Sequence, residues 1–455
     1  MPSPKIAIVG AGMAGMAAAG ALRQAGIEVE IYEQAHQFGR IGAGIQMLPN
    51  SMKVLRGIGV EPMLRERAFA PYSHLNRVGD TGEIKRELPM PEELYGAPFL
   101  CMHRADLHEA LTSIVPSEIV HLDKQLVGLE QDGGAVTLSF SDATTAKADA
   151  VIGADGVHSV VREIIVGPDQ PIHRGRIAYR SVFSSSLLPK EISRSRTKWW
   201  GEDRHIVIYY TTRDRSQLYF VTSVPEPADW MTRESWSAKG DVNELRKAYA
   251  GFHSEVRMVL DACPDCHKWA ILERDPLPSW SRGRVVLIGD ACHPMTPYMA
   301  QGAATSIEDA AVLARCLKEV SIEGIESAFK RFEAHRKPRT SRIQEISSAN
   351  TWTAVMTIPP GSMAMMPGMS RLMNPRQRPD PARNRPRHDD FSDVVTGEFH
   401  HAGRCFDRLY AACRTAGRQA ALARASSADP LAGARPQYLE WRGAAVDRPI
   451  GCADV

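Results

Sequence analysis

The chain has 455 residues, of which 44% are hydrophobic, and this is enough to bury a large core and to form two or more domains. Its formal net charge of +2 excludes a strong overall attraction to nucleic acid or to an anionic membrane, and no apolar run is long enough to span a bilayer. Its eight cysteines are too sparse for a disulfide framework, which is typical of a reducing compartment, so we expect a soluble, cytoplasmic protein.

Residues 5–33 predict a strand, a tight turn, a helix and a second strand. The apolar run K-I-A-I-V ends at Val9, an alanine-rich segment continues to Gln24, and Gly26 supplies the stop signal of a helix. A second apolar run, V-E-I-Y, follows. This order is that of a βαβ unit, in which the two strands are parallel neighbours.

The turn of this unit carries a G-x-G-x-x-G pattern made by Gly10, Gly12 and Gly15, and Glu33 closes the second strand. Such glycines let the backbone turn tightly and approach a pyrophosphate, and the N-terminus of the helix attracts the phosphate charge. The acidic residue accepts hydrogen bonds from a ribose. The unit therefore predicts a dinucleotide-binding site.

Two further predicted strands end in a carboxylate. Asp155 follows the buried-strand pattern at 150–153, and Asp290 follows the apolar run at 284–288. Open α/β sheets bind ligands outside the carboxyl ends of their strands, so these two side chains are expected near the dinucleotide. A helical pattern then runs from about Gly302 through Leu317.

Between about residues 171 and 270 the pattern is that of β-strands separated by polar loops, which indicates a second, sheet-based domain. Because side chains alternate along a strand, His205 and Tyr209 share one face, and Ile206, Ile208 and Tyr210 share the other. Four residues of strand span roughly 13 Å. His205 and Tyr209 are therefore expected to line one long wall of a pocket.

The glycine pattern, the G-A-D-G segment around Asp155, the G-D segment at Asp290 and Arg104 in H-R-A-D-L occur in an order that resembles the single-component flavoprotein aromatic hydroxylases of the para-hydroxybenzoate hydroxylase type. The resemblance covers roughly residues 5–350. It implies an α/β fold with a Rossmann-like FAD-binding domain of the glutathione reductase type and a β-sheet substrate domain. It also implies FAD as cofactor, NADH or NADPH as co-substrate, and O2 and a small aromatic molecule as substrates.

The same resemblance implies a role for each cofactor-binding position. Asp290 would bind the ribityl chain of FAD, Pro297 would stiffen the loop beside the flavin ring, and the amides of Gly302 and Ala303 would face the ring edge that becomes negative on reduction. Three more positions are implied: the FAD phosphates or ribityl chain would contact Arg40 and Arg104, and both FAD and NAD(P)H would contact Asp155. Since no second G-x-G-x-x-G is present, we expect no separate pyridine-nucleotide domain.

The resemblance to this family implies that the chain divides into a discontinuous FAD-binding domain and a substrate domain. The FAD-binding domain is expected to comprise residues 1–72, 99–170 and 271–352. The substrate domain is expected to comprise residues 73–98 and 171–270. The remaining segment, 358–455, is rich in Arg, Ala and Pro, which favours disorder, with a helix around 404–424 as the alternative.

Stretches outside the FAD motifs resemble family members that hydroxylate hydroxypyridine carboxylates with loss of CO2. They are K-W-W-G-E-D-R-H (198–205), Y-Y-T-T (209–212), M-A-Q-G (299–302) and A-N-T-W (349–352). The resemblance implies that His205 and Tyr209 line the substrate site and that Tyr298 and Met299 contact the substrate. The implied reaction converts 6-hydroxynicotinate, or an isomer such as 5-hydroxypicolinate, into 2,5-dihydroxypyridine.

Three positions depart from those members. Gln46 stands where they have a catalytic His, Tyr298 where they have a second pocket His, and Arg196 where they have a pocket Cys. A Gln cannot take up a proton, so His205 or Tyr209 is expected to act as the base, or the substrate binds already ionised. We expect an ionisation of His205 between about pH 6 and 8. Arg196 is either the partner of a carboxylate or a solvated loop charge.

Two other functions remain open at this stage. One is a salicylate- or phenazine-type flavin hydroxylase on the same fold, and the other is an FAD-binding protein without catalytic activity. We expect no metal site, because the C-x-x-C pattern at Cys263 and Cys266 lacks a partner pair. Both a monomer and a homodimer are compatible with the sequence.

Overall fold

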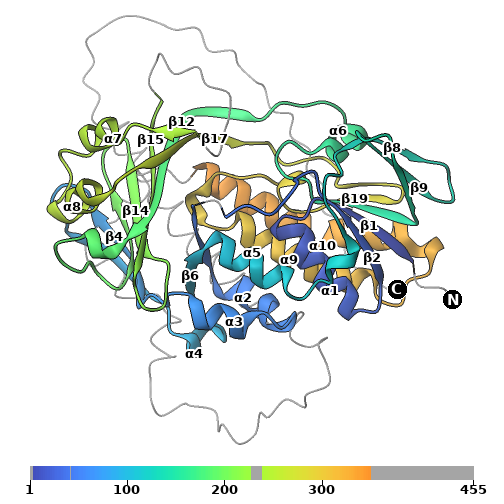
Figure 1. The fold of residues 1–455 in the computed structure, drawn as a ribbon, viewed down its shortest axis with the longest axis horizontal. Helices are drawn as coiled ribbons and strands as arrows, with labels where there is room; N and C mark the ends of the chain where they lie inside the picture. The colour runs from blue at the N-terminus through green and yellow to red at the C-terminus, as the bar shows by residue number, and fades with distance from the viewer. Residues whose placement is uncertain (1–3, 41, 227–237, 350–455) are drawn as a thin grey trace, which may run out of the picture.

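The computed structural model describes residues 4–40, 42–226 and 238–349. They build two large sheets that lie side by side, with helices between and around them, and two smaller sheets (Figure 1). The tail at 358–455, its candidate helix at 404–424 and the last three residues of A-N-T-W lie outside the described residues. Within the described part of the chain, no helix is both long and apolar enough to cross a membrane.

The first sheet contains the predicted βαβ unit. In the described part of the chain it has six strands, in the spatial order β18 (Ser281–Arg282), β19 (Val285–Leu287), β11 (Ala150–Gly153), β1 (Lys5–Val9), β2 (Glu28–Tyr32) and β7 (Val120–His121). All neighbours pair in parallel except β18 with β19. Because β1 lies between β2 and β11, the chain order reverses at β1, which is where such sheets bind their ligands.

Small residues allow helix α1 (Met13–Gln24) to lie close to this sheet and to α9 (Gly302–Leu317) (Figure 1). The helices of the described residues are α1, α2 (Pro49–Gly57), α3 (Glu61–Arg67), α4 (Glu92–Tyr95), α5 (Arg104–Thr112), α6 (Val160–Val166), α7 (Val242–Ala248), α8 (Ser254–Ala262), α9 and α10 (Ile325–Ala349). Short 3-10 turns are η1 (Ser117–Ile119), η2 (Ser185–Leu187), η3 (Gly289–Ala291), η4 (Pro297–Met299) and η5 (Ile322–Gly324). The helix predicted over 302–317 is thus confirmed.

The second sheet draws its strands from two separate stretches of sequence. Its eight described strands follow the spatial order β16 (Lys239–Gly240), β17 (Cys266–Glu273), β12 (Ile172–Ser184), β15 (Gln217–Pro225), β14 (His205–Tyr210), β13 (Arg196–Trp200), β4 (Ser73–Val78) and β5 (Ile84–Pro89). Smaller sheets pair β3 (Gly44–Met47) with β6 (Leu100–His103), and β8 (Leu126–Gln131) with β9 (Val136–Phe140) and β10 (Thr145–Ala148). This grouping is compatible with the predicted domain boundaries, which remain a proposal.

The two faces of the second sheet differ in chemistry. One face is apolar and aromatic, and it packs against α7 and α8 on the outside of the molecule (Figure 1). The strand register places Arg196 and Lys198 of β13 on the other face, together with His205 and Tyr209 of β14, as predicted for the latter pair. This polar face contacts β3 and the loop before α9, where the candidate site lies.

Candidate functional site

The glycine turn after β1 has the shape that a dinucleotide requires. Gly10 has a φ of +101°, and a Cβ there would lie 2.5 Å from the Ala154 carbonyl oxygen. A Cβ on Gly15 would lie 1.9 Å from the Gly10 carbonyl oxygen, so only glycine lets α1 start this close to β1. A Cβ on Gly12 would instead meet no atom within 4 Å. The turn is therefore closely packed at its ends and open at its centre, which fits the approach of a pyrophosphate.

Glu33 lies at the end of β2 with its carboxylate turned toward this turn. Its Oε2 accepts a hydrogen bond from the Ala11 amide at 2.7 Å, and its Oε1 accepts one from the Ala35 amide at 2.9 Å. These bonds fix the carboxylate beside the glycines and leave lone pairs for further donors. The arrangement fits the predicted contact with the ribose of FAD.

Asp290 and Arg104 lie near one another beyond the strand ends. Asp290 is accessible to solvent, yet the surrounding protein raises its pKa by desolvation, and the charges of His293 and Arg104 oppose that rise. Burial likewise lowers the pKa of Arg104, and Asp290 opposes it. An accessible carboxylate enclosed by protein is suited to bind hydroxyl groups such as those of a ribityl chain.

Two other predicted cofactor residues have partners within the protein. Arg40 donates to the Asp106 carboxylate at 2.8 Å and its side chain is 58% exposed. Asp155 accepts from the Ser159 hydroxyl at 2.5 Å and from the Val161 amide at 3.1 Å, so its carboxylate stabilises the start of α6. Their contacts with FAD and NAD(P)H remain predictions.

The loop from η3 to α9 runs beside these groups. Pro297 opens η4, Met299 and Tyr298 follow it half-buried, and Ala300 has a φ of +52°, which turns the chain into α9. At the start of α9, a Cβ on Gly302 would have Met295 at 3.9 Å and the Asp290 Oδ1 at 4.0 Å as its nearest neighbours. The first amides of α9, at Gly302 and Ala303, are thus reachable by a ligand, and a helix N-terminus favours an anionic group there.

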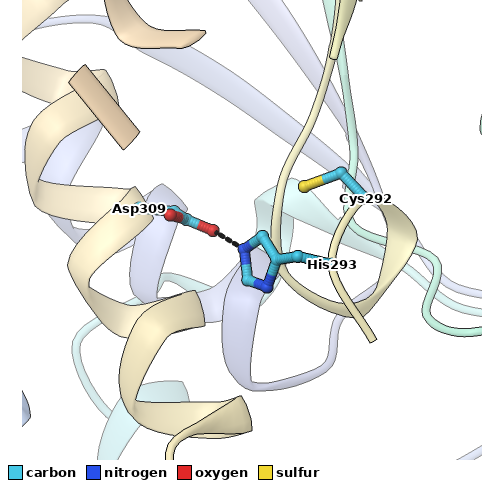
Figure 2. Close-up of side chains that lie close together, drawn as sticks. All are labelled: Cys292, His293 and Asp309. Atoms are coloured by element: carbon cyan, nitrogen blue, oxygen red, sulfur yellow. Dashed lines mark hydrogen bonds and ion pairs between the residues drawn. The ribbon is translucent and has the colours of Figure 1, made fainter. Parts of the chain in front are cut away.

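Behind this loop lies a buried network of charges that connects it to α9 and α10. Figure 2 shows the Asp309 carboxylate directed at the His293 ring, 2.6 Å from its Nε2, with Cys292 beside it. Asp309 also accepts from the Gly289 amide at 3.0 Å and from Arg336 at 2.7 Å. The Cys292 thiol donates to the Gly289 carbonyl at 3.4 Å, and burial keeps its pKa well above the ordinary value. The cluster is therefore an ion-pair network that holds the loop on α9 and α10.

The polar face of the second sheet meets the loop at Tyr298. The Tyr298 hydroxyl lies 3.0 Å from the Ser223 hydroxyl of β15, and its ring meets the His205 ring edge to face at a centroid distance of 5.4 Å. The Trp200 ring also lies near the His205 ring, at a centroid distance of 5.2 Å. Tyr298 and His205 are thus brought together, and their contact with a substrate remains a prediction.

Gln46 and Arg196 are also brought together. Arg196 Nε donates to Gln46 Oε1 at 2.9 Å, Arg196 contacts His74, and Gln46 hydrogen-bonds to the Tyr209 phenol. The Arg196 side chain is 3% exposed, so the alternative of a solvated loop charge is wrong. The guanidinium holds the Gln46 amide in one orientation, because an Arg can only donate and must face the amide oxygen.

The surroundings of Tyr209 and His205 also change the expectation that either side chain acts as the base. Burial raises the pKa of Tyr209 well above its ordinary value, so the phenol stays protonated near neutral pH and is unsuited to accept a proton. Burial, followed by the charges of Lys198, Arg176 and Arg196, lowers the pKa of His205 well below its ordinary value. The expectation that His205 ionises between about pH 6 and 8 is therefore wrong. The ring is neutral at those pH values and can accept a hydrogen bond, but the same surroundings disfavour its protonated form and make it a weak base.

Sequence reasoning missed Lys198 and His74, which share the polar face with Arg196. His74 lies opposite Arg196 in the parallel pairing of β4 with β13, and Lys198 is two residues further along β13. Side chains alternate along β13 as they do along β14, so the sequence predicts that Lys198 shares a face with Arg196. His74 could not be found in this way, because its position depends on a pairing between distant segments.

The sequence matches the FAD binding domain family over residues 4–347, a range that spans both sheets. It is 45% identical over 358 residues to the 6-hydroxynicotinate 3-monooxygenase of Pseudomonas fluorescens, covering 77% of this chain and 92% of that one. The protein of the same name from Bordetella bronchiseptica is 42% identical over 356 residues, covering 77% and 92%. The structure of Klebsiella pneumoniae HpxO with FAD and uric acid matches with a TM-score of 0.69 at 25% identity, covering 78% of this chain and 90% of that one.

Proposed function

This chain belongs to the FAD binding domain family and is an FAD-dependent aromatic monooxygenase, and from that premise we propose that it hydroxylates a hydroxypyridine carboxylate with loss of CO2. The substrate is 6-hydroxynicotinate or an isomer such as 5-hydroxypicolinate. The products are 2,5-dihydroxypyridine, CO2 and water, with NADH as the electron donor. Support comes from the 45% identical relative named for 6-hydroxynicotinate.

The observation that carries this proposal is the composition of the polar sheet face beside the flavin loop. It combines aromatic rings at Tyr298 and Trp200 with buried cationic side chains at Arg196 and Lys198. Aromatic walls suit a planar ring, and buried cations suit an anionic one, because an unpaired buried charge is costly. A ring that carries a carboxylate and a hydroxyl group satisfies both features.

The residues described above would hold FAD with its pyrophosphate at the glycine turn and its ring beside the loop that ends at Gly302. Bound FAD, once reduced by NADH, activates O2 so that one oxygen atom reaches the substrate ring. Neutral His205 accepts a hydrogen bond from the ring hydroxyl, which polarises its O–H bond and raises the electron density of the ring. Gln46, held by Arg196, and Tyr209 donate hydrogen bonds and keep the ring in place.

Turnover of three ring acids tests the proposal. The purified, FAD-loaded protein is given NADH and O2 with 6-hydroxynicotinate, 5-hydroxypicolinate or salicylate, and product masses are measured together with NADH oxidation. We expect one pyridine acid to lose CO2 and to gain one oxygen atom. Preferred conversion of salicylate would support the salicylate-type alternative instead, and NADH oxidation that yields only peroxide with all three would reject both.

The pH dependence of kcat/KM tests the role of His205. Because its pKa is lowered well below the ordinary value, His205 remains neutral as the pH falls from 8 to 6, and the fraction able to accept a hydrogen bond stays constant. We therefore expect that ionisation of the enzyme does not lower kcat/KM between pH 8 and 6, and that kcat/KM falls only at lower pH. A midpoint between pH 6 and 7 that disappears in the His205→Asn variant would contradict this assignment.

A further inference from the structure

Lys198 carries a buried amino group for which the described residues supply no anionic partner. Its side chain projects from the centre of β13 and is 2% exposed. Its Nζ lies 3.9 Å from the centroid of the Trp200 ring and 5.9 Å from that of Tyr298. Among the described residues, no carboxylate forms a salt bridge with Lys198.

A charged neighbour of Lys198 has the same sign. Arg196 precedes it by two residues on the same face of β13, and the neutral His205 ring lies opposite Trp200 on β14. Burial lowers the pKa of Lys198 well below its ordinary value, and the charge of Arg196 lowers it further. The charged form of this buried amine is therefore costly in the empty site, and an anion that binds beside it favours that form.

The aromatic neighbours keep this ammonium group in one place. Trp200 Nε1 donates to the Asn76 side chain at 2.8 Å, which fixes the indole ring that the Lys198 Nζ faces. Tyr298, the more distant of the two rings, belongs to the loop that leads into α9. The Lys198 Nζ thus lies near the point where the second sheet meets this loop.

We propose that Lys198 binds the carboxylate of the aromatic substrate and is a determinant of specificity for ring acids. This inference rests on the proposed function and deepens it by assigning the carboxylate partner. Lys198 is preferred over Arg196 because the Arg196 guanidinium is already engaged with Gln46 and His74. Arg196 contributes positive potential and orients Gln46, while Lys198 retains donors for the ligand.

The test compares ligands with and without a carboxylate. Calorimetry on the FAD-loaded protein measures Kd for 6-hydroxynicotinate against 2-hydroxypyridine, and for salicylate against phenol, with the Lys198→Met variant and with wild type. Loss of a charge-assisted hydrogen bond is expected to weaken binding of the two acids roughly 10- to 100-fold. Binding of the two neutral ligands is expected to change less than about threefold. Equal losses for acids and neutral ligands, or no loss for any, would overturn the proposal.

Lys268→Met is the matched control. Lys268 lies in the same sheet, on β17, but it faces a carboxylate, with Glu244 Oε2 at 3.8 Å from its Nζ. Its replacement is expected to leave all four affinities unchanged. A thermal melt provides a second measurement: Lys198→Met should unfold at a temperature equal to or above that of wild type, because methionine removes an unpaired buried charge. A large fall in Tm would assign Lys198 a structural role and overturn the proposal.

The two hypotheses fail in different ways. If no pyridine acid is turned over but Lys198→Met selectively weakens salicylate, the substrate class is wrong and the role of Lys198 stands. If a pyridine acid is decarboxylated and hydroxylated by Lys198→Met with unchanged KM and Kd, the proposed function stands and the role of Lys198 is rejected.

Discussion

The Gly15→Ala variant is expected to lose both FAD binding and most of its stability. A Cβ at this position would lie 1.9 Å from the Gly10 carbonyl oxygen and 3.4 Å from the Ile8 side chain. The closer contact is with backbone, which no rotamer change can relieve, so α1 would have to move away from β1. Overpacking in a core costs about 1–3 kcal/mol and more where backbone must shift, and we expect the upper end or beyond. Chemical denaturation and the ratio of flavin to protein measure the two effects.

The Gly12→Ala variant is the matched control. Gly12 has a φ of −75°, which alanine adopts freely, and its Cβ would meet no atom within 4 Å. We expect the apoprotein to lose about 1 kcal/mol or less, the cost of replacing an N-cap glycine. FAD binding is nevertheless expected to weaken, because the methyl group enters the space that the pyrophosphate approaches. Equal stability and equal flavin content in the two variants would contradict the assigned roles of these glycines.

The cofactor side of the site could be predicted from sequence because it depends on local geometry. The positive φ of Gly10, the contact between Gly15 and the preceding turn, and the position of Glu33 after the next strand are all encoded within a single βαβ unit. The alternation that places His205 and Tyr209 on one face of β14 is equally local. Each of these features depends on residues that are close together in the sequence.

The environment of Arg196 could not be predicted in the same way. Its neighbourhood in the sequence, S-R-S-R-T-K, is polar and resembles a loop. The residue becomes part of a buried strand because β13 pairs in parallel with β4, more than a hundred residues away in the chain. The ionisation of His205 was predicted wrongly for a related reason, since its pKa is set by burial and by charges on other strands. Non-local packing decides both properties.

The buried charges on α9 are recognisable from the amino-acid sequence of the helix. Glu308 and Asp309 stand next to one another in a helix that is otherwise rich in alanine and apolar residues. Charges on a buried helix require partners, so this pair predicts a cation from another element. The partners proved to be Arg336 and Arg339 of α10 together with His293.

The Arg336→Met variant is expected to lose about 3–5 kcal/mol of unfolding free energy. Arg336 is 2% exposed and pairs with Glu308 at 2.8 Å and with Asp309 at 2.7 Å, and both carboxylates are fully buried. Removal of Arg336 leaves Glu308 with Arg339 and Asp309 with His293, so two buried carboxylates share too little positive charge, which is the costly way to break such a network. Denaturant unfolding measures the loss. Arg331→Met is the control. Arg331 on the same helix is exposed, and within the described residues it donates only to the Cys316 carbonyl, so a change within about 0.5 kcal/mol is expected.

The pH dependence of the unfolding free energy distinguishes the loss of ion pairs in Arg336→Met from a loss of packing. Burial alone would raise the pKa of Glu308, but Arg336 and Arg339 lower it to about 2, and His293 and Arg336 lower that of Asp309. Carboxylates with depressed folded-state pKa values stabilise the fold above their unfolded pKa, and this stabilisation is lost as the pH falls through the folded value. Wild type should therefore lose roughly 3 kcal/mol from Glu308 alone between about pH 5 and 2. In Arg336→Met these pKa values rise, so the difference from wild type should narrow as the pH falls. A difference that stays constant from pH 7 to pH 3 would indicate that Arg336 acts by packing alone.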